Sequence, residues 1–180
     1  MQRRPHGVVA PVRMFRERHE NAERNRTMAT VQNAQIVSLQ LCVGHREPMR
    51  QVDAATLIAG FGIDGDRHAT ADGVRAGRQV LLMDEETLEA LSLERGEVRE
   101  NISVSGMDLA VMASGHRLML GDEVVLRVSE HCAPCARMDE IRPGLRAELE
   151  GRRGVLTSVE QGGTIKVGDP ITVMEPVTAS

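Results

Sequence analysis

The sequence predicts a mostly β domain with a barrel-like sheet and one or two short helices. Short apolar runs rich in β-branched residues recur along the chain and are separated by glycine- and aspartate-containing turns, as in small barrels. Residues 118–126 and 164–173 share one pattern, in which apolar residues precede Gly-Asp and an alternating strand follows. A doubly wound parallel sheet needs helical patterns of about 10–15 residues between its strands, and the sequence shows no such alternation. These observations favour a closed or nearly closed β-barrel.

Six segments have the composition of buried or half-buried strands. The first is apolar and β-branched with partial alternation, and the second is a continuous apolar run. The Gly-Asp pairs at residues 121–122 and 168–169 mark turns, because glycine adopts backbone angles that other residues avoid and aspartate bonds back to the local backbone. The predicted strands span residues 36–41, 79–83, 98–104, 123–128, 155–159 and 171–174.

One helix has a clear beginning and end in the sequence. Asp84 has the residue type of an N-cap and is followed by two glutamates in the first turn. Leu88 and Leu91 then fall on one face, and Gly96 is expected to end the helix. Residues 145–149 are expected to add one or two further helical turns.

The first thirty residues differ from the rest of the chain. They hold seven arginines and three glutamates, which gives a net charge of +4. Because the whole chain carries −4, the remaining residues carry −8. The first thirty residues show no apolar periodicity. We therefore expect residues 1–32 to be an arginine-rich, disordered extension, with Met28 as an alternative start. Residues 33–175 form the predicted domain, and residues 176–180 form a short tail.

The composition excludes several functional classes. The chain has no Trp or Tyr and only two Phe, so it lacks the aromatic faces on which single-stranded nucleic acids stack. The acidic body would also repel phosphate, and we expect no nucleic-acid partner. No apolar run approaches the roughly 20 residues that span a bilayer. We expect a cytoplasmic protein without a membrane partner.

The scarcity of lysine excludes further chemistry. Lys166 is the single lysine, against 21 arginines among the 22 basic residues. A pyridoxal phosphate enzyme holds its cofactor through a lysine Schiff base, and Lys166 lies in a segment that resembles a strand edge. We therefore expect no covalently bound pyridoxal phosphate. The sequence also contains no phosphate-binding P-loop motif.

The sharpest local motif is Cys132-Ala133-Pro134-Cys135, closely followed by Arg137. Three chemical interpretations of this motif are possible. It could be half of a zinc site, a thioredoxin-type dithiol, or a thiolate that ligates a metal or carries sulfur. The zinc interpretation lacks a second ligand pair, and the thioredoxin interpretation lacks the expected βαβ unit. Two buried structural cysteines would explain the spacing equally well, because cysteine packs as a small hydrophobic residue.

Two further clusters are weaker. On a strand, Arg99 and Asn101 would project from the same face and present a phosphate-binding fork beside an amide. Asp64, Asp66 and His68 alternate and would suit a divalent metal, although an ordinary turn with aspartate side chains bonded to the backbone explains them better.

The order of these motifs along the chain resembles the MOSC domain, named after the C-terminal part of molybdenum-cofactor sulfurases. The resemblance covers residues 33–175. It rests on the ordered set rather than on any single motif. The set comprises residues 62–69 (Gly-Ile-Asp-Gly-Asp-Arg-His-Ala), 80–84, 99–102 (Arg-Glu-Asn-Ile), 120–122, 132–135 and 168–169.

The resemblance implies a barrel-like fold with a functional cysteine at Cys135. In molybdenum-containing relatives this cysteine ligates the metal as a thiolate, and in sulfurase-type relatives it carries sulfur as a persulfide. The implied cofactor is the molybdenum cofactor (molybdopterin). Arg99 and Asn101 fall on a pattern that contacts the pterin, and Arg67, His68 and Arg137 are further cofactor-binding candidates. Cys132 matches a cysteine present in some members.

Two enzymatic roles follow from the resemblance: sulfur transfer, and molybdenum-dependent reduction of N-hydroxylated compounds. Larger members have an additional N-terminal β-domain and a pyridoxal-dependent desulfurase domain, and neither is recognisable in this sequence. A cysteine desulfurase-like sulfur donor or a redox partner would therefore act in trans. The alternative is a non-enzymatic binding or regulatory β-barrel whose Cys132/Cys135 pair is structural or a redox switch.

Overall fold

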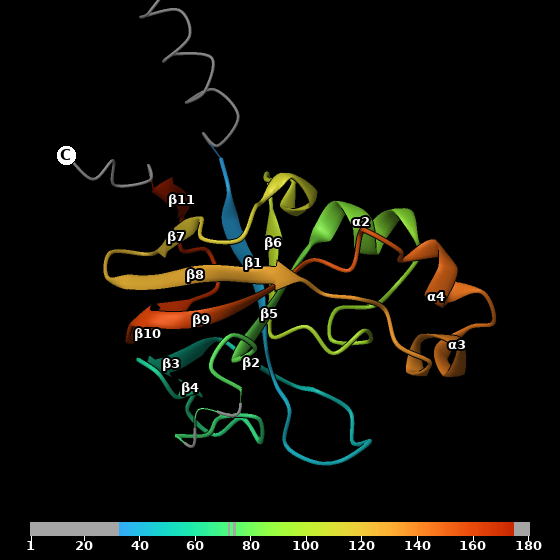
Figure 1. The fold of residues 1–180 in the computed structure, drawn as a ribbon, viewed down its shortest axis with the longest axis horizontal. Coiled ribbons are helices and arrows are strands. Elements are labelled where there is room, and N and C mark those ends of the chain that lie inside the picture. Colours follow the sequence, from blue (N-terminus) through green and yellow to red (C-terminus); the bar gives the residue numbers. More distant parts are fainter. Residues whose placement is uncertain (1–32, 72, 74, 175–180) are drawn as a thin grey trace, which may run out of the picture. The chain divides into compact units, whose positions relative to one another are not determined.

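The computed structural model describes residues 33–71, 73 and 75–174, and these residues form two β-sheets with short helices at one end (Figure 1). The predicted extension at residues 1–32 and the tail at 176–180 lie outside the described residues. The smaller sheet has the order β10-β3-β4. Its strands are β3 (Ala54–Ile58), β4 (Gly62–Ile63) and β10 (Gly163–Lys166).

The larger sheet has eight strands in the order β11-β7-β8-β9-β5-β6-β1-β2, and only its β5–β6 pair is parallel. All six predicted strands contribute to it, which confirms the mostly β class. Its strands are β1 (Gln35–Leu41), β2 (Arg50–Val52), β5 (Val80–Asp84), β6 (Ile102–Ser105), β7 (Arg117–Leu120), β8 (Val124–His131), β9 (Val155–Gln161) and β11 (Ile171–Met174).

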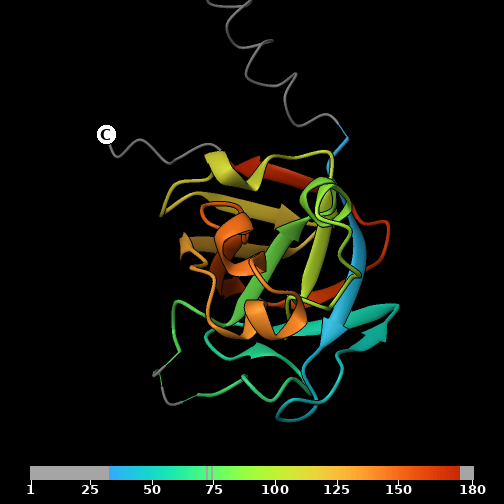
Figure 2. The ribbon, with the colours of Figure 1, turned by 90° about the vertical axis from the view of Figure 1, so that its right-hand side faces the viewer.

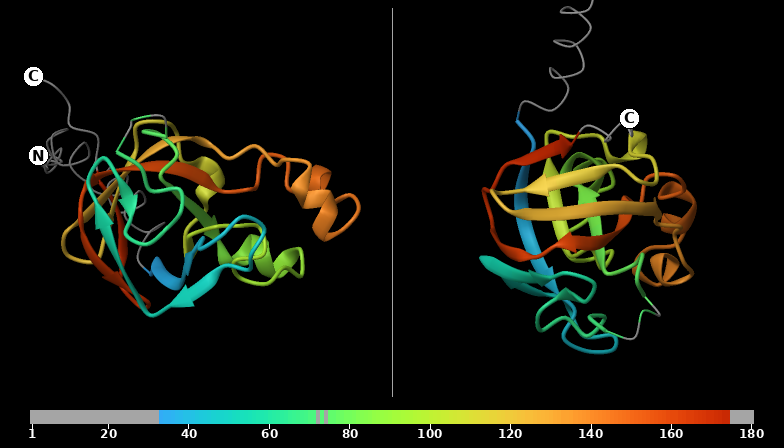
Figure 3. Two further views of the ribbon diagram at one scale, coloured as in Figure 1. Left: turned by 90° about the horizontal axis from the view of Figure 1, so that it is seen from below. Right: turned by 60° about the vertical axis from the view of Figure 1, so that its left-hand side comes forward.

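The larger sheet curves strongly but is not a closed barrel (Figure 3). The start of β1 nevertheless meets the turn before β11. Ile36 N–H donates to the Asp169 carbonyl at 2.9 Å, Ile171 N–H donates to the Ala34 carbonyl at 2.8 Å, and Gln35 forms a bridge with Pro170. The predicted Gly168-Asp169 turn makes this contact, with Gly168 at φ +95°. The sheet is therefore nearly closed by a few backbone hydrogen bonds rather than by a full strand ladder.

The helices gather where β8 and β5 end (Figure 2). In the described residues they are α2 (Glu85–Ala90), the 3-10 turn η1 (Leu109–Val111), α3 (Arg137–Ile141) and α4 (Leu145–Glu148). Apolar side chains from α2, α3 and α4 form one buried cluster with the end of β5. Each of these helices is too short to be stable alone, so this packing stabilises them. The cluster comprises Met83, Leu88, Val98, Met138, Leu145 and Leu149.

Two predicted elements differ from the structure. Asp84 is the N-cap of α2 and accepts from Thr87 N–H at 3.0 Å, as predicted, but the helix ends at Ala90 rather than near Gly96. The predicted strand at 98–104 is present only as Ile102–Ser105. Arg99 has φ +72°, a left-handed conformation that a strand does not contain, so Arg99 and Asn101 do not share a strand face.

No described helix is long and apolar enough to cross a membrane.

The backbone at Gly154 passes unusually close to β5. Gly154 has φ +69°, and an added Cβ would meet the Leu82 carbonyl oxygen at 1.9 Å. Gly154→Ala is expected to lower the free energy of unfolding by at least about 2 kcal/mol, since the left-handed conformation alone costs about 1–2 kcal/mol and the clash adds to it.

Gly151→Ala is the matched control for this variant. Gly151 has φ +71°, but a Cβ added there would meet no atom within 4 Å. Only the cost of the left-handed backbone conformation, about 1 kcal/mol, therefore applies to this variant. Urea denaturation of both variants measures the difference. Equal stabilities would show that β5 moves aside without cost.

Candidate functional site

The Cys132–Cys135 segment joins the end of β8 to the start of α3. The three cysteines of the chain are free thiols, and they differ in exposure: Cys42 and Cys132 are buried, and Cys135 is exposed. The Cys135 carbonyl accepts from Met138 N–H at 3.0 Å, which fixes this residue at the entry to α3. Cys135 is thus the thiol available to an incoming reactant.

Selective alkylation is expected to reveal this difference. Native protein treated with iodoacetamide should be modified at Cys135, whereas Cys42 and Cys132 should react only after unfolding, because a buried thiol is shielded from the reagent. Peptide mass spectrometry assigns the site, and the same treatment in denaturant is the control. Modification of Cys132 as fast as Cys135 would contradict the geometry.

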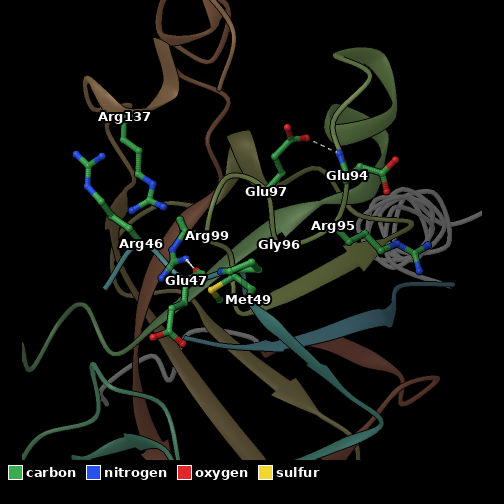
Figure 4. A pocket seen from close by; sticks show the side chains of 10 residues that line it. Arg46, Glu47, Met49, Glu94, Arg95, Gly96, Glu97, Arg99 and Arg137 are labelled. Atoms are coloured by element: carbon green, nitrogen blue, oxygen red, sulfur yellow. Dashed lines mark hydrogen bonds between the residues drawn. The ribbon is translucent and has the colours of Figure 1, made fainter. Parts of the chain in front are cut away.

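A pocket of about 330 Å³ lies beside the start of α3 (Figure 4). Its walls come from the loop between β1 and β2, the segment between α2 and β6, and the first residue of α3. This volume lies at the lower end of the roughly 300–1,000 Å³ typical of small-molecule sites. The lining residues are Arg46, Glu47, Pro48, Met49, Glu94, Arg95, Gly96, Glu97, Arg99 and Arg137.

Three arginines, Arg46, Arg99 and Arg137, gather on one side of the pocket and form an arginine wall (Figure 4). Arg46 forms an exposed ion pair with Glu140, with 3.3 Å between the guanidinium nitrogen and the carboxylate oxygen. The Arg137 side chain has no hydrogen bond or ion pair within the described part of the chain. Three neighbouring cations with one exposed carboxylate partner repel one another, and a bound anion would relieve that repulsion.

The rest of the pocket is more acidic. Glu97 and Glu94 line it away from the arginine wall, and the Glu97 carboxylate accepts from Glu94 N–H at 2.8 Å. Arg95 points away from the wall and pairs with Glu85 at 2.6 Å. The pocket therefore offers cationic donors at the arginine wall and carboxylate acceptors at Glu94 and Glu97, and Glu47 adds a carboxylate on the side of Arg99 (Figure 4).

Arg99 is held in place by the loop opposite it. Its guanidinium donates to the carbonyls of Glu47 and Gly44 and to the thiol sulfur of Cys42, the last at 2.5 Å. The contact with Cys42 links the pocket to the interior of the sheet. Arg99 thus holds the loop at residues 42–49 in place, and its guanidinium remains part of the arginine wall.

The buried Glu100 supports the same segment from behind. Its side chain is fully buried, accepts from Gly96 N–H, and accepts from Ser103 Oγ at 3.3 Å. Burial raises the pKa of Glu100 to about 7. Its other carboxylate oxygen has no partner in the described structure, so the protonated form is favoured below about pH 7.

Asn101 lies in a buried network rather than in the pocket lining. Its amide donates to Asp66 at 2.9 Å and to the Gln40 carbonyl at 3.1 Å, and its oxygen accepts from Leu81 N–H. Asp66 also accepts from the backbone N–H groups of Cys42 and His68 at 2.7 and 2.8 Å. This network fixes the turn at residues 64–68 against β1 and β5.

The electrostatics of that turn follow from the same contacts. Burial would raise the pKa of Asp66, but hydrogen bonds from His68 and Cys42 outweigh it and hold that pKa below its usual range. His68 Nδ1 lies 3.1 Å from Asp66, and Arg67 is exposed, with its backbone N–H on the Cys42 carbonyl. Within the described residues no group of three or more His, Cys, Asp or Glu is arranged to hold a metal ion.

The structure therefore divides the predicted cofactor-binding residues into two groups. Arg99 and Arg137 line one pocket, and Cys135 precedes Arg137 by two residues. Asn101 and His68 contact Asp66, which accepts from Cys42 N–H, and the Arg67 N–H donates to the Cys42 carbonyl. This second group is connected to the pocket through the Cys42–Arg99 contact. Their roles toward a ligand stay predictions.

Two arginines at the site carry no signal in the sequence. Arg46 lies in an irregular loop, and Arg153 is one of two arginines between two glycines. Arg153 is buried and donates to Cys132 Sγ at 3.1 Å. Burial raises the pKa of Cys132, and the nearby Arg153 charge opposes that rise. Only the tertiary structure distinguishes these two arginines from the others.

Comparison with known proteins gives the fold and the family. The MOSC domain family profile matches residues 64–172. The crystal structure of YuaD from Bacillus subtilis matches with a TM-score of 0.64 and 24% identity over 77% of this chain and 93% of that protein. No curated protein sequence matches the chain.

Two structures of YiiM show the same fold. YiiM from Escherichia coli matches with a TM-score of 0.61 and 17% identity over 81% of this chain and 72% of that protein. YiiM from Geobacillus stearothermophilus matches with a TM-score of 0.63 and 16% identity over 79% of this chain and 75% of that protein. With the profile match across more than half of the sequence, these similarities show that the chain belongs to the MOSC domain family.

Proposed function

We propose that this protein binds the molybdenum cofactor, or a related sulfur-bearing species, in the pocket beside α3 and uses Cys135 as its reactive thiolate. The observation that carries the proposal is the arginine wall, which presents three cations next to the segment that exposes Cys135. Family membership supports the same ligand, since the MOSC domain is associated with molybdenum-cofactor proteins.

The residues present fit the parts of this cofactor. Its phosphate would be held by Arg46, Arg99 and Arg137, because guanidinium groups bind phosphate oxygens with paired donors. Its pterin ring carries N–H groups, and Glu97 offers a carboxylate acceptor across the pocket. The soft Cys135 thiolate suits molybdenum better than a carboxylate would. When bound, the metal would supply two-electron redox chemistry at this thiolate.

The chain's own residues would prepare this site in advance. Glu100 and the Cys42–Arg99 contact fix the two loops that form the walls, so that binding does not have to order them. Arg137 is free to turn toward an anion, because no described residue binds its guanidinium. Cys135 stays exposed at the entry to α3, where it is open to a partner protein.

Two roles for Cys135 follow. As a sulfur carrier, its thiolate attacks the terminal sulfur of a donor's persulfide, forms a new sulfur–sulfur bond and releases the donor's thiolate. As part of a reductase for N-hydroxylated compounds, Cys135 would hold the metal of the bound cofactor, and an electron donor would act in trans. Both roles require a partner, either a cysteine desulfurase-like donor or a redox protein.

Elemental analysis tests the cofactor proposal. Protein expressed in a host that makes the cofactor is compared with Cys135→Ser for molybdenum and tungsten content. We expect near-stoichiometric metal in the wild type and its loss in the variant, with unchanged circular dichroism. Arg152→Gln, at an exposed position outside the pocket lining, is the control and should keep its metal. Metal that persists undiminished in Cys135→Ser would overturn the assignment.

A further inference from the structure

The two thiols of the Cys132–Cys135 segment have different surroundings. Cys132 is 7% exposed and packs with Leu81 and Leu156, and its backbone N–H donates to the Gly154 carbonyl at 3.0 Å. It is therefore fixed at the end of the sheet, whereas Cys135 is exposed on the loop before α3. Only Ala133 and Pro134 separate the two cysteines along the chain.

Arg153 lies against Cys132 without a carboxylate partner in the described structure. Its guanidinium is buried and donates to Cys132 Sγ, the Ala133 carbonyl and the Val98 carbonyl, each at 3.1 Å. Its Nε has no partner there. A guanidinium is always charged in a protein, and burying that charge without an anion is costly. An anionic sulfur on Cys132 would supply the missing counter-charge.

We propose that Cys132 is a resolving thiol, which attacks sulfur bound to Cys135 and is positioned for this by Arg153. The inference rests on the proposed sulfur-carrying role of Cys135. In this step the Cys132 thiol gives up its proton and its sulfur bonds to the Cys135 sulfur, while the bond from Cys135 to the outer sulfur breaks.

The step balances without an external oxidant. The products are a Cys132–Cys135 disulfide and hydrosulfide, which takes the proton from Cys132. The Cys132 sulfur is oxidised and the outer sulfur is reduced, while the Cys135 sulfur stays at the disulfide level. Spacing favours this pairing, since two residues between cysteines is the spacing of dithiol oxidoreductases. A cellular dithiol would then reduce the disulfide and restore both thiols.

An aryl disulfide tests the resolving step independently of any sulfur donor. The reduced full-length protein is mixed with 5,5′-dithiobis(2-nitrobenzoate), which forms a mixed disulfide with an exposed thiol and releases a coloured thiolate. The wild type is expected to release a second thiolate and to end lower in mass by two hydrogen atoms, with Cys132 joined to Cys135. Cys132→Ser should release one and keep the aryl adduct on Cys135.

Variants of Arg153 test its positioning role. Arg153→Gln should slow the second release about tenfold, as expected for the loss of one charge-assisted hydrogen bond, and leave the first release unchanged. Arg152→Gln, its exposed neighbour, should change neither phase. A general loss of structure would alter both phases, so the split between them separates positioning from folding.

Two results would overturn the proposal: a wild type that keeps the adduct on Cys135, or a second release from Cys132→Ser as fast as in the wild type. An inorganic polysulfide then tests sulfur carriage itself. If Cys135 takes up no sulfur, the carrier role fails while the aryl disulfide result still shows resolution. If Cys135 takes up sulfur and the wild type releases no hydrosulfide, the resolving role fails and the carrier role stands.

Discussion

Replacing Arg46 and Arg137 together with glutamine is expected to reduce the affinity for the pterin cofactor about a hundredfold or more. Each arginine would lose charge-assisted hydrogen bonds to the phosphate, and such bonds contribute about 1.5–3 kcal/mol each. Arg137 has no partner within the described residues, so Arg137→Gln alone removes no internal contact seen there. A loss in that single variant therefore reports on the ligand rather than on the fold.

The pterin content of purified protein measures this effect. Oxidation releases a fluorescent pterin that is quantified against protein concentration, and equilibrium dialysis gives the affinities. Arg95→Gln lies in the same pocket but points away from the arginine wall, so its loss of cofactor should be smaller. Wild-type pterin content in the double variant would show that the phosphate binds elsewhere.

The second large effect is on stability and depends on pH. Glu100 has a pKa of about 7 in the folded protein, against 4.5 when free, because burial disfavours its charge. The folded state therefore holds this proton more tightly than the unfolded state does. The resulting stabilisation is fully present below about pH 4.5 and is lost as the pH rises through about 7, with a total of about 3 kcal/mol.

Glu100→Gln should remove this pH dependence, because glutamine keeps an acceptor oxygen for Gly96 and never ionises. We expect the variant to match the wild type near pH 5 and to exceed its free energy of unfolding by about 3 kcal/mol near pH 8.5. Denaturant titrations at both pH values test this. Glu94→Gln, at an exposed position in the same segment, is the control. Parallel pH profiles for the wild type and Glu100→Gln would contradict the prediction.

The sequence predicts the sheet better than it predicts the site. Strands such as β5 and β9 are recognisable because their apolar, β-branched residues are contiguous along the chain. The Asp84 cap and the Gly-Asp turns also depend on neighbouring residues only. Cys135 and Arg137 belong to a motif, and the structure places one on the surface and the other in the pocket.

The remaining features depend on contacts between residues far apart in the chain. Arg99 departs from the strand pattern because its side chain bonds to residues 42–47, more than fifty positions earlier. Asn101 likewise satisfies groups on two separate strands. Arg153 resembles every other arginine until burial beside Cys132 distinguishes it. Local sequence carries no information on such pairings.

The hydrogen bonds between the turn at 168–171 and the start of β1 also bear on how the chain is made. During synthesis β1 leaves the ribosome more than 120 residues before its partner at residues 168–171. Until then the start of β1 exposes unpaired backbone groups, which are prone to pair with other chains. Loops of this length close slowly, so this contact is expected to form later than the pairing of β1 with β2. A truncation that removes residues 168–180 would leave the protein permanently in that unprotected state.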